Sequence, residues 1–145
     1  MLVVDTNILV YAADVDSPFH NRCRTWLEAQ RARPDAWYST WQTLYEFLRV
    51  TTHAKVMRRP WSFGEAWEFV QALLASPGLD ILIPTSRHAE VVQAVVAEIP
   101  YLAGNLVYDA HIAILMREHG IRRICTRDSD FHRFPFIEVI DPMQL

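Results

Sequence analysis

The sequence predicts an α/β fold, a three-layer α/β/α sandwich built on a mainly parallel sheet of about five strands. Short β-branched runs such as Met1-Leu2-Val3-Val4 alternate along the chain with longer segments of helical periodicity. Strands separated by helices imply right-handed crossovers, and the resulting parallel sheet is covered by helices on both faces. The 145 residues are expected to form one domain, residues 1–145.

The expected elements follow in order. Five apolar or β-branched segments bounded by turn residues are predicted strands: residues 1–4, 37–40, 80–83, 123–126 and 137–140. Segments with an apolar stripe at helical spacing are predicted helices: residues 8–13, 18–33, 41–52, 62–75, 86–98 and 106–119.

Helix boundaries in the first half are predicted from capping residues. Asp5-Thr6-Asn7 offers capping side chains to the first helix, and Pro18 suits the first turn of the second. Pro34 ends that helix, and Thr40 is expected to cap the next one. Trp26, Trp41 and Trp67 stand at core spacing and are expected to pack inside.

Further boundaries in the second half have similar signals. Ser62-Phe63-Gly64-Glu65 is a capping box, and Pro77-Gly78 stops the helix that it opens. Thr85 and Asn105 are expected to cap the two following helices. Gly120 closes the last helix in the usual C-terminal position.

Composition limits the kind of protein. With 51% hydrophobic and 21% charged residues, the chain has the composition of an ordinary globular protein, and its net charge of -3 argues against a broadly basic nucleic-acid surface. We expect a cytoplasmic protein without membrane association, because no leader-like start or membrane-length apolar run is present. The cysteines, Cys23 and Cys125, have no metal-ligand spacing.

Four acids stand where apolar or buried positions are expected. Asp5 and Asp128 follow two predicted strands, and ligands of parallel sheets bind beyond the carboxyl ends of the strands. Glu46 and Asp109 lie in predicted helices, on strips shared with apolar residues, and are therefore expected to face the sheet. The sequence thus predicts one acidic pocket assembled from the whole chain.

Clustered carboxylates repel one another, and a hard divalent cation with oxygen ligands, Mg²⁺ or Mn²⁺, is the simplest compensation. Phosphodiester hydrolysis fits such a site. Each acid also has a plainer interpretation: Asp5 as a helix cap, Glu46 as a solvated helix edge, and Asp109 as a partner of the helix dipole. Asp128 and Asp130 alone would be turn formers.

Arginine and lysine form one dense stretch. Positive charge beside Trp61 would suit a phosphate backbone and a stacked base, although basic residues also favour an ordinary helix C-terminus. Two further arginines flank the last acidic loop, where they would touch phosphates or pair with the acids. The candidate RNA-binding residues are Arg49, Lys55, Arg58, Arg59, Arg127 and Arg133.

An ordered set of motifs resembles the PIN-domain family, and within it the VapC-type toxins of bacterial toxin–antitoxin pairs. The set consists of Asp5-Thr6-Asn7, Glu46, Asp109-Ala110-His111-Ile112-Ala113 and Thr126-Arg127-Asp128-Ser129-Asp130-Phe131. The resemblance covers the whole chain. It implies a metal-dependent ribonuclease that acts on RNA, forms a homodimer and is held inactive by a cognate antitoxin.

The resemblance also implies roles for individual residues. Asp5, Glu46, Asp109 and Asp128 match the metal-binding catalytic carboxylates. Asp130 matches a second acid that is commonly present. The remaining polar residues of the motifs are possible supports near the metal: Thr6, Asn7 and Thr126.

Two other functions stay open at this point. A phosphatase with Asp5 as nucleophile would need a second acid two residues later, where this chain has Asn7, and a lysine better placed than Lys55. A non-catalytic module would use the same acids only to bind a structural ion or a basic partner.

Overall fold

The computed structural model describes residues 1–145, and it contains the five strands and six α-helices expected from the sequence. The strands are β1 (Val3–Val4), β2 (Trp37–Ser39), β3 (Leu79–Ile81), β4 (Arg123–Cys125) and β5 (Glu138–Ile140). The α-helices are α1 (Thr6–Ala13), α2 (His20–Ala32), α3 (Trp41–Thr51), α4 (Phe63–Leu74), α5 (His88–Glu98) and α6 (Leu106–Glu118). Two short 3₁₀ helices are η1 (Ser129–Arg133) and η2 (Pro142–Gln144). No helix combines the length and the apolar character needed to cross a membrane.

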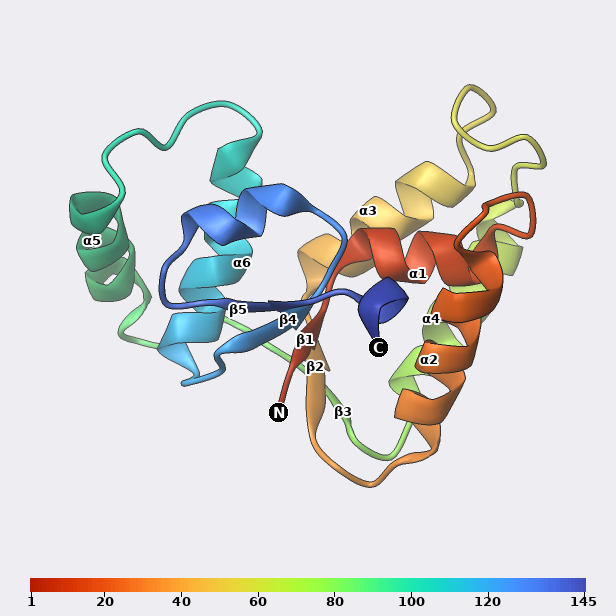
Figure 1. Cartoon of the computed structure of the whole chain (residues 1–145), viewed down its shortest axis with the longest axis horizontal. Coiled ribbons are helices and arrows are strands. Elements are labelled where there is room, and N and C mark those ends of the chain that lie inside the picture. The colour runs from red at the N-terminus through yellow and green to blue at the C-terminus, as the bar shows by residue number, and fades with distance from the viewer.

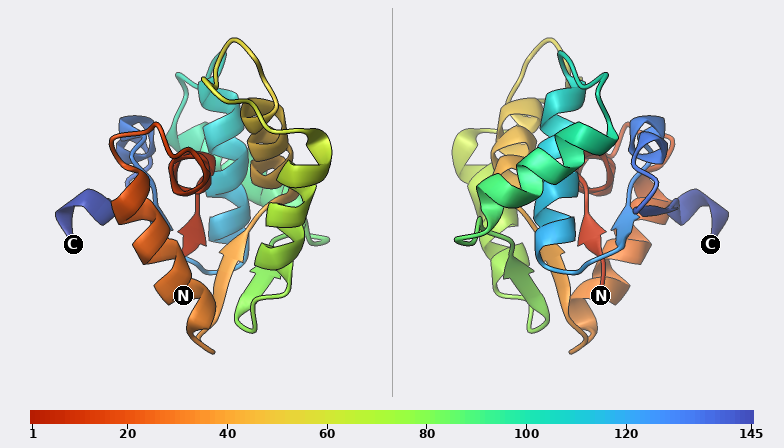
Figure 2. Two further views of the ribbon diagram at one scale, coloured as in Figure 1. Left: turned by 90° about the vertical axis from the view of Figure 1, so that its right-hand side faces the viewer. Right: turned by 90° about the vertical axis from the view of Figure 1, so that its left-hand side faces the viewer.

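All strands are parallel, in the order β3-β2-β1-β4-β5. Helices α5 and α6 lie on one side of the sheet and α1 to α4 on the other (Figure 1). The two further views in Figure 2 agree with this layering. The predicted α/β/α sandwich is therefore confirmed, and its sheet is parallel throughout rather than mainly parallel.

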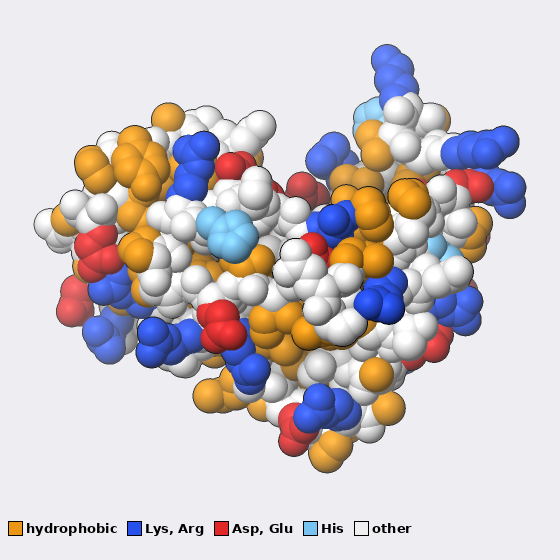
Figure 3. All heavy atoms as spheres, in the orientation of Figure 1, with side chains coloured by type: hydrophobic (Ala, Val, Ile, Leu, Met, Phe, Trp, Pro, Cys, Tyr) orange, Lys and Arg blue, Asp and Glu red, His pale blue; other side chains and the backbone are white.

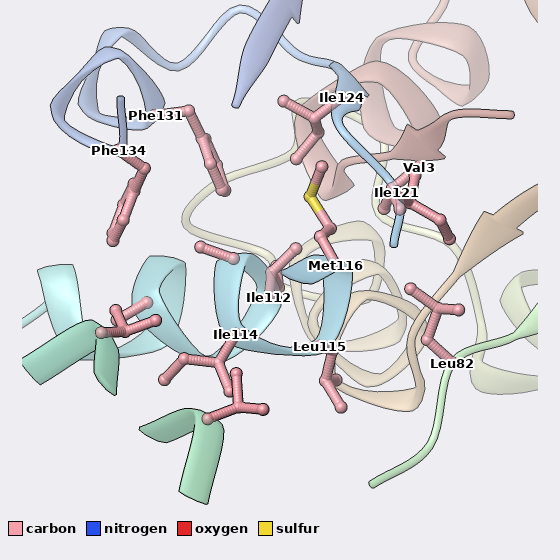
Figure 4. Close-up of a cluster of buried hydrophobic side chains, with 14 of the residues drawn as sticks. Val3, Leu82, Ile112, Ile114, Leu115, Met116, Ile121, Ile124, Phe131 and Phe134 are labelled. Carbon is pink, nitrogen blue, oxygen red and sulfur yellow. The ribbon is translucent and has the colours of Figure 1, made fainter. Parts of the chain in front are cut away.

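Successive residues of the central strands enter two separate cores, as the period of a strand requires. Val3 and Ile124 pack with α5, α6, Phe131 of η1 and Phe134 directly after it, the cluster drawn in Figure 4. Val4 and Cys125 pack with α1 to α4 on the opposite face. Because each face is buried, a slip of one residue in register would exchange the two cores.

The predicted caps are mostly confirmed. The side chain of Thr40 accepts a hydrogen bond from the backbone N–H of Thr43 at 3.0 Å, and Ser62 forms the full capping box with Glu65. Gly120 has a φ of 70°, the left-handed conformation that a glycine adopts without strain. The expected cap at Thr85 is wrong: α5 begins at His88, Arg87 occupies the N-cap position without a side-chain capping bond, and the Thr85 hydroxyl accepts from the N–H of Arg87 ahead of the helix.

Two further expectations on the helices are wrong. Asn105 occupies the position before α6 but makes no side-chain capping bond, because its own backbone is already helical. Trp41 is 43% exposed instead of packed, since the inner face of α3 is filled by Leu44, Phe47 and Leu48. Both residues lie near the carboxyl edge of the sheet, where a cleft opens.

Candidate active site

A cleft of about 620 Å³ lies between α3 and α6, at the carboxyl edge of the sheet. The chain order in the sheet reverses around β1 and β4, which is where ligands bind in open parallel sheets. Figure 3 shows a notch at this edge of the molecule, with Asp and Glu atoms in and beside it. Its lining residues are Asp5, Gln42, Glu46, Arg49, Asn105, Tyr108, Asp109, Ile112, Asp128 and Asp130.

Asp5, at the end of β1, is buried and held on both carboxylate oxygens. Its Oδ1 accepts a hydrogen bond from the N–H of Thr6 at 2.7 Å, so the expected capping role is real. Its Oδ2 accepts bonds from the Thr126 hydroxyl at 2.7 Å and the Asn7 amide at 3.0 Å. Since Asn7 also accepts from the N–H of Arg127, these polar residues join the start of α1 to the loop after β4. The result is a rigidly oriented carboxylate in the cleft floor.

Glu46 lies on the wall that α3 forms. Its side chain is 45% exposed, so the expectation that it faces the sheet is wrong. Glu46 lies on the face of α3 that lines the cleft, whereas the neighbouring Thr43 and Phe47 are buried. The hydroxyl of Thr6 donates to Glu46 Oε2 at 3.0 Å, which still directs the carboxylate toward the other acids.

Three carboxylates form the tightest group in the cleft. One ligand oxygen from each of Asp109, Asp128 and Asp130 lies within 4.8 Å of the others. Asp128 Oδ1 accepts from the N–H of Asp130 at 2.9 Å, so Asp128 is also the turn former considered above. Asp130, matched by the resemblance only as a second acid, thus stands beside Asp109 and Asp128.

The electrostatics of the cleft disfavour ionised carboxylates. Burial, and then the charges of Asp128, Asp5, Asp130 and Glu46, raise the pKa of Asp109 to about 7. Burial also raises the pKa of Asp5 to about 6, although its hydrogen bonds from Thr126 and Thr6 act in the opposite direction. Carboxylates held together in spite of this repulsion provide the oxygen ligands that a hard divalent cation prefers.

The predicted basic residues divide into three groups. Arg49 lines the cleft, 4.0 Å from Glu46, and Arg133 pairs with Asp130 at 3.6 Å. Arg127 turns away, pairing with Asp141 and lying over the ring of Phe19. Lys55, Arg58 and Arg59 lie in the loop after α3, outside the cleft lining.

The expected exposed aromatic beside that basic stretch is absent. Trp61 is partly buried and packs against the core, with its ring centroid 6.2 Å from that of Phe47 and 5.8 Å from that of Phe69. The stretch therefore lacks the stacking partner that the sequence suggested.

Sequence reasoning missed three uncharged polar residues of the cleft. Gln42 precedes Glu46 by one helical turn, and Asn105 precedes Asp109 by the same interval. Tyr108 adjoins Asp109 and is 64% exposed. Extending each acidic strip by one turn would have found Gln42 and Asn105 from periodicity alone.

Comparison with known proteins gives a consistent result. The family model described as PIN domain matches residues 2–137. Ribonuclease VapC48 of Mycobacterium tuberculosis is 34% identical over 138 residues, which cover 95% of this chain and 94% of that protein. Ribonuclease VapC37 of the same organism is 33% identical over 145 residues, covering 100% and 99%.

Solved structures share the fold at lower identity. The Mycobacterium tuberculosis toxin VapC20, described as cleaving the sarcin-ricin loop, superposes with a TM-score of 0.67 at 18% identity, covering 96% of this chain and 98% of that one. A chain of VapBC2 from Rickettsia felis, bound to a promoter DNA fragment, gives 0.65 at 16% identity, covering 97% of each. A chain of a toxin-antitoxin complex from Klebsiella pneumoniae gives 0.60 at 20% identity, covering 98% of each.

Proposed function

The chain belongs to the PIN-domain family, and from this premise we propose that it is a metal-dependent endoribonuclease, the toxin of a toxin–antitoxin pair. Full-length similarity to proteins named as VapC ribonucleases supports the reaction. The observation that carries the proposal is the group of carboxylates in the cleft, whose mutual repulsion calls for a divalent cation.

We assign the cation, Mg²⁺ or Mn²⁺, to the carboxylates of the cleft. Asp109 and Asp128 would hold it together with Asp5 and Glu46, and Asp130 is close enough to take part. When bound, such an ion lowers the pKa of a coordinated water and neutralises charge that develops on a phosphoryl group. Two-carboxylate phosphatase chemistry finds no support, because Asn7 stands in place of the second acid and is bonded to Asp5 and Thr126.

The remaining side chains orient the acids. Thr6 donates its backbone N–H to Asp5 and its hydroxyl to Glu46, and so sets the spacing between the cleft floor and the α3 wall. Asn7 and Thr126 hold the second oxygen of Asp5. Orienting bonds of this kind place ligand oxygens before any ion binds, which reduces the cost of assembling the site.

RNA would approach along the side of the cleft where Arg49 lies. The guanidinium of Arg49 is within reach of phosphates near the acids and offers several donors to one of them. Lys55, Arg58 and Arg59 would meet the RNA strand farther away. Arg59 is paired with Asp16, Arg127 with Asp141 and Arg133 with Asp130. We therefore rank Arg49 first among the phosphate contacts.

Cleavage of RNA oligonucleotides by the purified protein tests the proposal. We expect endonucleolytic products with Mn²⁺ or Mg²⁺, no products with EDTA, and none from Asp109→Asn. Binding of Mn²⁺ should raise the melting temperature of the wild type, because an ion that binds only the folded state stabilises it. A wild type that binds Mn²⁺ but cleaves no RNA would instead support the non-catalytic binding module.

We further propose that the protein acts in the cytoplasm and has two protein partners, an antitoxin and a second copy of the chain. Complexes of the structural neighbours, named as VapBC2 and as a toxin-antitoxin complex, support the first. Large apolar side chains exposed along α5 and its flanking turns, Ile83, Val96 and Tyr101, offer surface for a protein contact. Sedimentation of the purified chain should give a dimer, and co-expression with a cognate antitoxin should give a complex without nuclease activity.

A further inference from the structure

One part of the cleft lining, the uncharged side, consists of polar side chains without a formal charge. It is made by Gln42 at the start of α3 and by Asn105 and Tyr108 at the start of α6. The rest of the lining consists of the five acids, Arg49 and Ile112. If the scissile phosphate is held among the acids, a neighbouring nucleoside must lie against one of the cleft walls. The chemistry of the uncharged side would then influence which base is accepted there.

Gln42 is held in one orientation by two hydrogen bonds to α6. Its Nε2 donates to the carbonyl oxygen of Tyr108 at 3.2 Å, and its Oε1 accepts from Nδ1 of His111. A carbonyl only accepts, so the amide nitrogen must face Tyr108 and the amide oxygen must face His111. That arrangement requires the hydrogen of His111 on Nδ1. The amide retains one N–H and one lone pair for a ligand.

Tyr108 supplies a different kind of contact. Its ring is 64% exposed although it lines the cleft beside Asp109. An exposed aromatic ring next to a phosphate site offers a face on which a base can stack, irrespective of the identity of the base. Asn105 adds an amide that makes no capping bond and is free to bind.

We propose that Gln42, Asn105 and Tyr108 form a nucleobase subsite, in which Gln42 reads the edge of an unpaired base and Tyr108 stacks on it. His111 is a positioning residue that acts through Gln42. The inference rests on the proposed ribonuclease function and deepens it, because it names the residues that select which RNA sequence is cut. A side-chain amide with a fixed orientation is suited to this task. An amide that rotates freely could pair with either a donor or an acceptor on the base, and would not discriminate between bases.

The test is cleavage of an RNA pool with randomised positions in Mn²⁺, with sequencing of the product ends. In wild type, one position near the cut should show a base preference, and Gln42→Ala should flatten it. The KM should rise about tenfold, equivalent to one lost hydrogen-bonded contact, while kcat changes less than about threefold. The Mn²⁺-induced rise in melting temperature should stay as in wild type, because the carboxylates are intact.

His111 and Tyr108 are tested by paired variants. His111→Phe, which removes the donor but keeps a ring, should flatten the same position, and the double variant with Gln42→Ala should be no worse than either single one. His111→Asn, which restores a side-chain N–H, should recover part of the preference. Tyr108→Ala should raise the KM, whereas Tyr45→Ala, an equally exposed tyrosine of α3 outside the cleft lining, should not.

The outcomes separate this inference from the proposed function. An active wild type whose base preference and KM are unchanged in Gln42→Ala and Tyr108→Ala would overturn the subsite and leave the ribonuclease proposal standing. A change of oligomeric state in Tyr108→Ala with unchanged KM would make the surface a protein interface and would also overturn it. A wild type that cleaves no RNA would overturn both.

Discussion

The two ends of α6 present the same chemical group in opposite environments. Asp109, in the first turn, is surrounded by four other acids, and its pKa is raised to about 7 by burial and by their charges. Glu118, the last residue, accepts hydrogen bonds from the backbone and hydroxyl of Thr85 and from His88, and its pKa is lowered to about 2. Burial disfavours the charge of both, so the partners decide the sign.

The difference teaches how to tell a binding carboxylate from a structural one. Glu118 is satisfied by this chain alone and ties the segment before α5 to the end of α6. Asp109 lacks such donors, so its ionised form stays unfavourable until a cation binds nearby. A carboxylate left in that state at the carboxyl edge of a parallel sheet is the one to connect with function.

The largest expected effect comes from removing the charge of Asp109. Asp109→Asn should lower RNA cleavage on the order of 100-fold or more, since a metal ligand is lost. The same change should raise the melting temperature without metal by about 2–4 °C, because repulsion among the acids is relieved. Calorimetry with and without Mn²⁺, beside a cleavage assay, measures both. A variant that is both less stable and fully active would break the comparison.

Removing the charge of Glu118 should act in the opposite direction. Glu118→Gln should lower the free energy of unfolding by about 2 kcal/mol, since charge-assisted hydrogen bonds to Thr85 and His88 are weakened. Nuclease activity of the folded fraction should remain near that of the wild type. Urea unfolding at neutral pH provides the measurement, and an unchanged midpoint would show that the hydrogen bonds to Glu118 do not stabilise the fold.

The pH dependence of stability should carry both signs. Asp109 has its pKa raised from 3.8 to about 7, so the folded state holds its proton more tightly and stability falls as pH rises between these values. Glu118 has its pKa lowered from 4.5 to about 2, so its contribution is present above 4.5 and is lost as pH falls toward 2.

Unfolding curves recorded from pH 2 to 8 without metal separate these two slopes. Asp109→Asn should reduce the fall in stability on the neutral side, where Asp5, with a pKa of about 6, contributes the remainder. Glu118→Gln should reduce the loss on the acid side. Saturating Mn²⁺ should reverse the neutral-side slope, since the ion competes with protons for Asp109.

The smallest expected effect comes from the hydroxyl of Thr85. Thr85→Val removes the hydroxyl that donates to Glu118 and accepts from the N–H of Arg87, but leaves the backbone N–H bond to the same oxygen of Glu118. The free energy of unfolding should fall by about 1 kcal/mol, roughly half of the Glu118→Gln effect. If urea unfolding gave equal losses of stability for Thr85→Val and Glu118→Gln, the stabilisation would come from the Thr85 hydroxyl alone.

The sequence by itself determined the layers, the parallel strands, the capping box at Ser62 and the chain positions of the acids. These features depend on local periodicity and capping, which neighbouring residues decide. It also placed Asp5 and Asp128 at the same edge of the sheet, because residues that follow parallel strands meet there.

Only the tertiary structure decided what surrounds each carboxylate. Periodicity placed Glu46 toward the sheet, but the opening between α3 and α6 leaves it partly exposed on a wall. The sequence pattern of a single helix predicts neither the proximity of Asp130 to Asp109 nor the hydrogen bond between His111 and Gln42. Such relations depend on distances between elements far apart in the chain, and the opposite pKa shifts at the two ends of α6 follow from those distances.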